Sequence, residues 1–239
     1  MSRILLVATA ADSITLADGT EHPTGFWAEE LVTAYRDLSE AGHEIVIASP
    51  GGARPPVDPG STTAEGVGDA EKAADLRAYL DAISAHLDAA VPLAGIDVTE
   101  FDAVVIPGGH GPMVDLATDT DLGALLVAAV DRDTIIAPFC HGPAALLSAT
   151  RADGSFAFAG RRMTVFTNEE ELTGGLGEKN PWFVADALAE RGAVIERGDA
   201  WASVVVRDGS LISGQNPQSS EAVSRAVVEA LAARSSRSR

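Results

Sequence analysis

Short, uninterrupted aliphatic runs recur along the chain, and segments with helical spacing of apolar residues lie between them. The strand candidates are Ile4–Ala8, Glu44–Ala48, Ala103–Ile106 and Ile135–Phe139. Continuous rather than alternating hydrophobicity is typical of parallel strands that helices cover on both faces. The segments Phe26–Ala41 and Leu122–Val130 have the apolar spacing of helices. This alternation predicts an α/β fold in which right-handed crossovers connect a mostly parallel sheet.

Residues 51–98 interrupt this alternation between the second and third predicted strands. Gly51–Gly68 is rich in Pro, Gly, Thr and Asp, which predicts a loop, whereas Ala70–Ala90 has leucine and isoleucine at helical spacing. We expect this segment to be an insertion that covers the site as a small lid.

The C-terminal third ends in a predicted hairpin and a predicted helix. Ser203–Val206 and Leu211–Ser213 flank a turn that contains Asp208-Gly209, which predicts two antiparallel strands. Ser219–Arg234 predicts an amphipathic helix, and residues 235–239 predict a frayed tail. Because no repeat or linker divides the chain, we expect one domain over residues 1–239.

Composition narrows the possible classes of partner. Hydrophobic residues make up 46% of the 239 residues, which indicates a globular protein. The net charge of −18 opposes binding to nucleic acid or to an anionic membrane. No apolar run approaches the ~20 residues of a membrane span, and the first run is too short for a signal peptide. We therefore expect a cytoplasmic protein.

The single cysteine, Cys140, lies where a buried strand meets a Gly-Pro helix start. It excludes an internal disulfide, and no Cys/His spacing predicts a structural zinc site. In open α/β sheets, sites lie beyond the carboxyl ends of the strands, where helix N-termini favour a thiolate. A nucleophile with His141 as its base is one interpretation; a small buried hydrophobic side chain is the other.

The helix Phe26–Ala41 contains two adjacent acids that point in different directions. At 100° per residue, Glu30 falls within the apolar arc, whereas Glu29 points away from it. A buried carboxyl has a raised pKa and can donate a hydrogen bond as a neutral acid. The alternative is that Glu30 lies at the edge of the arc and reaches solvent.

Two further segments could contribute to chemistry. The turn Pro107–Pro112 contains Gly108-Gly109, whose N–H groups could approach a ligand closely, although tight turns are the commoner reason for such glycines. His110 in this turn is either a turn residue or a proton carrier. The acid cluster Glu169–Glu171 is either a solvated helix start or the source of a carboxylate that orients His141.

The order of these segments resembles the ThiJ/PfpI superfamily, and more narrowly its heat-shock chaperone and glyoxalase III branch. The resemblance covers nearly the whole chain and rests on Thr24–Glu30, Ala48–Gly52, Ile106–Gly111, Cys140–Pro143 and Gly214–Ser220. It implies a flavodoxin-like three-layer sandwich that is also shared with class I glutamine amidotransferases.

The resemblance also implies a role for each matching residue. Cys140 corresponds to the nucleophile, Glu30 to the acid that contacts its sulfur, and His141 to the histidine of a catalytic triad. Glu169 is the expected triad acid, with Glu170 as the alternative if a gap shifts the loop. The N–H groups of Gly109 and His141 correspond to an oxyanion hole. The segment Asn180–Val184 is less aliphatic than the family pattern, which bears on pocket shape.

The function implied is a glutathione-independent glyoxalase that adds water to methylglyoxal and related 2-oxoaldehydes and so forms lactate. The expected partner is a small aldehyde substrate; neither a cofactor nor a metal is expected. The same resemblance suggests a homodimer. The alternatives are a cysteine hydrolase (amidase, peptidase or protein deglycase) and a holdase chaperone, and thiol redox sensing is compatible with each of them.

Overall fold

The computed structural model describes residues 1–237, which form a seven-stranded central sheet of order β10-β11-β7-β6-β1-β4-β5. Its strands are β1 (Arg3–Val7), β4 (Glu44–Ser49), β5 (Val91–Pro92), β6 (Ala103–Ile106), β7 (Ile135–Pro138), β10 (Val205–Asp208) and β11 (Leu211–Gly214). Neighbours pair in parallel except β10 with β11, which form the expected hairpin. The predicted flavodoxin-like α/β fold, with a mostly parallel sheet, is confirmed.

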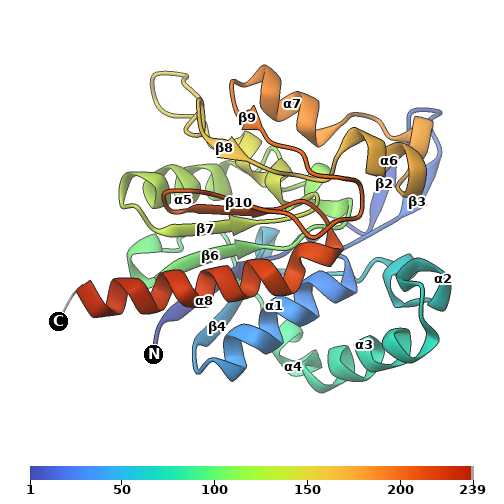
Figure 1. Ribbon diagram of the computed structural model, residues 1–239, viewed down its shortest axis with the longest axis horizontal. Coiled ribbons are helices and arrows are strands. Elements are labelled where there is room, and N and C mark those ends of the chain that lie inside the picture. The colour runs from blue at the N-terminus through green and yellow to red at the C-terminus, as the bar shows by residue number, and fades with distance from the viewer. Residues whose placement is uncertain (238–239) are drawn as a thin grey trace.

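Helices cover both faces of this sheet, which explains why its inner strands β1, β6 and β7 are almost entirely apolar. Helices α1 (Ala28–Glu40) and α8 (Ser220–Arg237) lie side by side on one face (Figure 1). Helix α5 (Thr120–Asp131), the 3₁₀ helix η5 (Gly142–Ser148) and α7 (Val184–Glu190) cover the other. Successive side chains of β1 alternate between the two cores: Ile4 packs towards α1 and Leu5 towards α5.

The segment between β4 and β6 is more structured than its sequence predicts. It contains α2 (Ala64–Val67), α3 (Ala70–Ala82), α4 (Ser84–Asp88) and the edge strand β5. The single helix expected over Ala70–Ala90 is therefore wrong: it breaks at Ile83, and α2 forms inside the expected loop. Leu76 and Leu80 anchor α3 in the core shared with α1. This packing holds α2 beside the carboxyl end of the sheet (Figure 1).

Several short elements lie outside the central sheet. They are β2 (Ser13–Thr15), β3 (Glu21–Pro23), β8 (Arg162–Met163), β9 (Val194–Ile195), α6 (Asn168–Gly174) and the 3₁₀ helices η1 (Pro50–Gly52), η2 (Pro59–Thr62), η3 (Val98–Glu100), η4 (Gly111–Met113), η6 (Gly177–Lys179) and η7 (Pro217–Ser219). Helix α8 continues to Arg237, so residues 235–237 of the expected frayed tail are helical, and residues 238–239 lie outside the described residues. Within residues 1–237, no helix is long and apolar enough to span a membrane.

Candidate active site

Cys140 lies in a strained turn at the carboxyl end of β7. Its φ is 56°, in the left-handed region that residues with a Cβ rarely adopt. The backbone on both sides fixes this conformation, because the Cys140 N–H donates to Gly214 O (3.0 Å) and Phe166 N–H donates to Cys140 O (2.9 Å). Position 142 requires glycine, because a Cβ there would overlap the carbonyl oxygen of Ile106. The strain and the tight packing together hold the thiol beyond the strand end.

The carboxyl of Glu30 lies above this turn and is completely buried. Its Oε2 accepts a hydrogen bond from Gly108 N–H at 2.6 Å, whereas Glu29 pairs with Lys72 at the surface. Glu30 therefore takes the inward position that the helix pattern predicts. Burial raises the pKa of Glu30 to about 8, and only the thiol of Cys140 and the Gly108 N–H favour its charged form. Its Oε1 is buried and accepts no hydrogen bond from the protein, which suits a protonated carboxyl that can donate to the nearby sulfur.

The imidazole of His141 connects the thiol to a carboxylate. Its Nδ1 lies 3.3 Å from Cys140 Sγ, and its Nε2 lies 2.6 Å from Glu171 Oε2. The prediction that Glu169 is the triad acid is wrong, because Glu171 contacts His141 whereas Glu169 is exposed on α6. Adjacent helical residues point about 100° apart, so a one- or two-residue difference in register changes which acid faces inwards.

Glu170, the alternative triad acid, is buried, but its carboxyl accepts hydrogen bonds from several distant segments rather than from a histidine. Its Oε2 accepts from Thr167 N–H in a capping box at the start of α6. Its Oε1 accepts from the backbone N–H of Trp201 (2.8 Å) and from the amides of Asn216 (2.7 Å) and Gln215 (3.2 Å). These contacts explain the Gly214–Ser220 motif: its amides tie the segment around Trp201 to α6.

A second histidine contacts the same acid. His110 Nε2 lies 3.1 Å from Glu171 Oε1, and the rings of His110 and His141 lie 4.2 Å apart. Burial would raise the pKa of Glu171, but the two imidazoles outweigh it and hold the pKa well below its ordinary range. An ionised carboxylate only accepts, so both Nε2 atoms donate, and Nδ1 of His141 is left as an acceptor towards the thiol.

The protonation state of the thiol and its base follows from burial. Burial, followed by the proximity of Glu30, raises the pKa of the Cys140 thiol well above its ordinary value. Burial also lowers the pKa of His141, with a further contribution from His110. The resting site therefore pairs a neutral thiol with a neutral imidazole, and the thiol proton must move when the sulfur attacks.

Two backbone N–H groups near the sulfur favour its negative charge. The N–H groups of Gly109 and His141 point towards Cys140 and favour its anionic form. Gly109 has φ 90°, and a Cβ there would overlap the Gly25 carbonyl oxygen, so this approach requires glycine. Both groups expected at an oxyanion hole are therefore beside the thiol.

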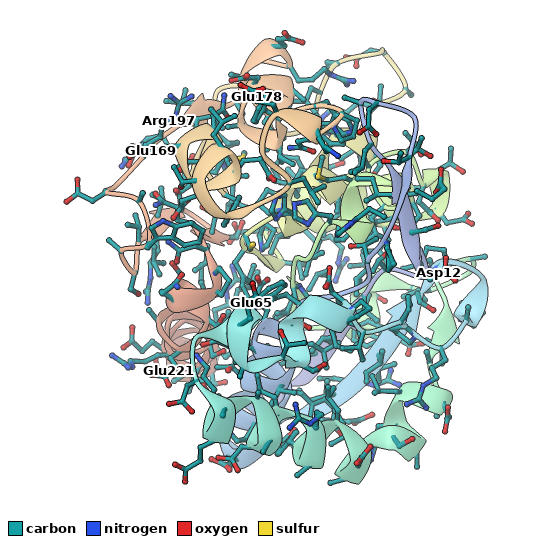
Figure 2. The ribbon with its side chains drawn as sticks, turned by 90° about the vertical axis from the view of Figure 1, so that its right-hand side faces the viewer. Asp12, Glu65, Glu169, Glu178, Arg197 and Glu221 are labelled. Atoms are coloured by element: carbon teal, nitrogen blue, oxygen red, sulfur yellow. The ribbon has the colours of Figure 1, made fainter. Side chains whose placement is uncertain are left out.

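A pocket of about 170 Å³ leads from the surface to Cys140 and His141. It opens between α2 and α6, the helices that carry Glu65 and Glu169 in Figure 2. The insertion contributes Val67 and Lys72 to its lining. Aromatic side chains form much of its wall: Trp27, Phe166 and Trp201.

Among the described residues, the donor atoms of His110, His141 and Glu171 lie within 4.8 Å of one another. Two imidazoles and a carboxylate are a ligand set that zinc uses. The same donor atoms already form the Glu171 hydrogen bonds, so a metal would displace the contact that orients His141. These are the side chains that could hold a metal at this site.

The sequence interpretation included Glu171 in the acid cluster but chose Glu169 or Glu170 as the triad acid, and it did not identify Trp201. One signal for Glu171 was available: Thr167-x-x-Glu170 matches a capping box, which assigns Glu170 to the helix start. No sequence pattern identifies Trp201, because it lies in a loop without periodicity.

Known proteins resemble this chain over nearly its full length. A protein/nucleic acid deglycase named HchA from Staphylococcus aureus is 26% identical over 231 residues, which cover 95% of this chain and 78% of that protein. The crystal structure of a protein designated APC35852 is 37% identical, with a TM-score of 0.83, and covers 98% of this chain and 100% of that one.

A glyoxalase III from Candida albicans shares the fold, with a TM-score of 0.80 at 23% identity over 96% of this chain and 97% of that one. The sequence model of the DJ-1/PfpI family matches residues 22–230. The chain therefore belongs to the DJ-1/PfpI family.

Proposed function

We propose that this protein converts methylglyoxal and related 2-oxoaldehydes to 2-hydroxy acids without glutathione, through covalent catalysis by Cys140. The observation that carries the proposal is the arrangement around the sulfur: a strained turn presents it to His141 Nδ1 at 3.3 Å, beneath buried Glu30. The deglycase relative and the glyoxalase III of the same fold support a reaction on a carbonyl carbon.

The first step adds the thiol to the aldehyde. Cys140 Sγ forms a bond to the aldehyde carbon, and the carbonyl oxygen becomes an oxyanion between the N–H groups of Gly109 and His141. The thiol proton passes to His141 Nδ1, which is its acceptor neighbour, and then neutralises the oxyanion. The product is a hemithioacetal.

The second step moves hydrogen between the two substrate carbons. His141, held by Glu171 at 2.6 Å, removes the C–H proton of the hemithioacetal and gives an enediol. Return of a proton to the neighbouring carbon produces a 2-hydroxy thioester. Water then cleaves this thioester, which releases the hydroxy acid and restores the thiol. Glu30, which is mostly protonated at neutral pH because its pKa is raised to about 8, donates a hydrogen bond to the sulfur throughout.

The test is lactate formation from methylglyoxal without glutathione or any added amine. Cys140→Ser should lower kcat by at least about 10³-fold because it removes the covalent intermediate. Glu171→Gln should lower kcat by about 10²–10⁴-fold because it removes the carboxylate that orients His141.

Glu169→Gln is the matched control, because it makes the same change two residues away on an exposed face of α6. It should leave kcat within about twofold of the wild type, as surface changes usually do. Undiminished activity in Cys140→Ser, or equal losses in the two glutamine variants, would contradict the mechanism.

The name of the Staphylococcus relative favours deglycation as a second candidate. The same nucleophile and oxyanion hole would then act on an adduct between an aldehyde and an amine. The net charge of −18 favours a protein adduct over a nucleic acid adduct. Lactate that forms only when a glycated amine is supplied would select this candidate. The holdase and homodimer expectations stay predictions.

A further inference from the structure

Trp201 lies at the pocket mouth in a conformation that the surrounding structure must enforce. Its φ is 64°, and 40% of its surface is exposed, although indole is a large apolar group. Its backbone N–H donates to the buried carboxyl of Glu170, and Asn216 donates to the same oxygen. The strain and exposure of Trp201 are therefore maintained by a buried hydrogen-bond network.

The position of the indole is as closely defined as its backbone. Gly174 of α6 lies against the ring, and a Cβ at Gly174 would come within 2.6 Å of it. On the other side the indole meets Phe166 edge to face, with ring centroids 5.6 Å apart. The indole is thus packed against α6 and Phe166, and Trp201 also lines the pocket.

The rings form a row that begins beside the reacting sulfur. His141, which contacts Cys140 Sγ, lies 4.5 Å from Phe166, and Phe166 leads to Trp201 at the mouth. Phe166 and Trp201 line the same pocket as Cys140, so the substituent of a hemithioacetal on Cys140 has room to lie against this row. The methyl group of methylglyoxal is too small to cover it. The pocket volume of about 170 Å³ exceeds the ~150 Å³ of an apolar cavity that binds benzene.

The charges around the pocket select against an anionic substituent. Lys72, the lysine in the lining, is paired with Glu29 at 2.6 Å. The two histidines of the lining both bind Glu171. The protein as a whole carries a net charge of −18, which adds long-range repulsion of anions. The lining thus suits a neutral, planar, apolar group.

We propose that Trp201 and Phe166 form a subsite for the substituent of the 2-oxoaldehyde, and that aryl 2-oxoaldehydes are preferred substrates over methylglyoxal. This inference rests on the proposed glyoxalase activity. Trp201 supplies the outer wall of the subsite, and the Glu170 network holds it there. Discrimination between substituents then depends on the ring of Trp201 and leaves the chemistry at Cys140 unchanged.

The kinetic test compares phenylglyoxal, which would give mandelate, with methylglyoxal. Wild-type kcat/KM should be at least about tenfold higher for phenylglyoxal, which is the discrimination an apolar pocket provides. Trp201→Ala should lower kcat/KM for phenylglyoxal about tenfold, mainly through KM, and lower that for methylglyoxal by a smaller factor, so that the ratio of the two values falls. Trp201→Phe should retain most of the preference.

Trp182→Ala is the matched control, because it removes the same side chain from a groove that lies apart from the active-site pocket. It should leave the ratio of the two kcat/KM values unchanged. A wild-type preference for methylglyoxal, or an equal loss for both aldehydes in Trp201→Ala, would overturn the subsite.

A binding measurement separates failure of the subsite from failure of the proposed reaction. Acetophenone, a neutral ketone with the same ring, is titrated into the Cys140→Ser protein with and without Trp201→Ala. We expect Trp201→Ala to raise the Kd for acetophenone about tenfold, as loss of an aromatic contact does. Acetophenone binding that is insensitive to Trp201→Ala would overturn the subsite whatever the enzyme turns over. Turnover of neither aldehyde by the wild type would overturn the proposed glyoxalase activity.

Discussion

At the scale of single residues, the buried carboxyl of Glu30 makes stability depend on pH. Its pKa rises from an ordinary 4.5 to about 8 on folding, because burial disfavours the charged form. The folded state therefore keeps a proton that the unfolded chain releases above pH 4.5. The stability that Glu30 contributes is complete below pH 4.5 and is lost as pH rises through about 8.

Glu30→Gln keeps the shape of the side chain and removes this titration. Between pH 5 and pH 8 the free energy of unfolding of the wild type should fall relative to the variant, by at most ~1.4 kcal/mol per pH unit. Urea unfolding at several pH values measures the difference. Glu29→Gln controls for the loss of one acid from α1. Parallel curves for Glu30→Gln and the wild type would mean that Glu30 is already charged in the folded protein.

The residues of the site differ in how far sequence could identify them. Cys140 follows an apolar strand and Glu30 falls on an apolar arc, so local periodicity is enough to single them out. Glu171 is recognisable only once the start of α6 is known, because the capping box decides which of three adjacent acids faces His141. Trp201 depends on contacts with Glu170 and Gly174, which are distant in sequence.

At the scale of elements, Gly123 shows how packing can override helix propensity. It lies inside α5, where alanine would ordinarily stabilise the helix by ~1 kcal/mol. A Cβ at this position would overlap the carbonyl oxygen of Ser148 at the end of η5. Gly123→Ala should therefore destabilise the protein by ~1–3 kcal/mol, as overpacking does.

Chemical denaturation of Gly123→Ala shows directly whether the free energy of unfolding falls or rises. Ala124→Gly, at an exposed position of the same helix, is the control and should cost ~1 kcal/mol through propensity alone. A Gly123→Ala protein more stable than the wild type would show that α5 can move away from η5 without cost.

The strands that sequence predicted well each contain a run of buried, apolar residues. β1, β4, β6 and β7 contain such a run because helices cover both faces of the sheet, and the predicted bounds of each differ from the observed ones by no more than one residue. The hairpin of β2 and β3 is not predicted, because its strands are short and their residues are mostly polar and exposed. The segment after Cys140 forms the 3₁₀ helix η5 rather than an α-helix, a difference that apolar spacing alone does not reveal.

At the scale of the whole molecule, the parallel sheet brings distant segments to one edge. β6 ends at the Gly109 turn and β7 at Cys140, and these strands are neighbours, so their ends meet. Helix α1 brings Glu30 to the same edge, and α6 brings Glu171. Sequence predicted this convergence because the order of strands and helices sets it, before any side-chain contact is known.

The excess of acidic residues sets the sign of the salt dependence of stability. The chain has 35 acidic and 17 basic residues, so repulsion opposes the compact state at neutral pH. Exposed ion pairs such as Arg207 with Glu229 contribute little and are also screened. Raising NaCl from ~0.02 to ~0.3 M shortens the screening length to a few ångströms and so weakens this repulsion. The higher salt should therefore stabilise the fold by about 1 kcal/mol and raise Tm by ~2–4 °C. Calorimetry at pH 7.5 measures this shift, and it should shrink at pH 5, nearer the isoelectric point of about 4.5. A Tm that falls with salt at pH 7.5 would show that local ion pairs outweigh the net repulsion.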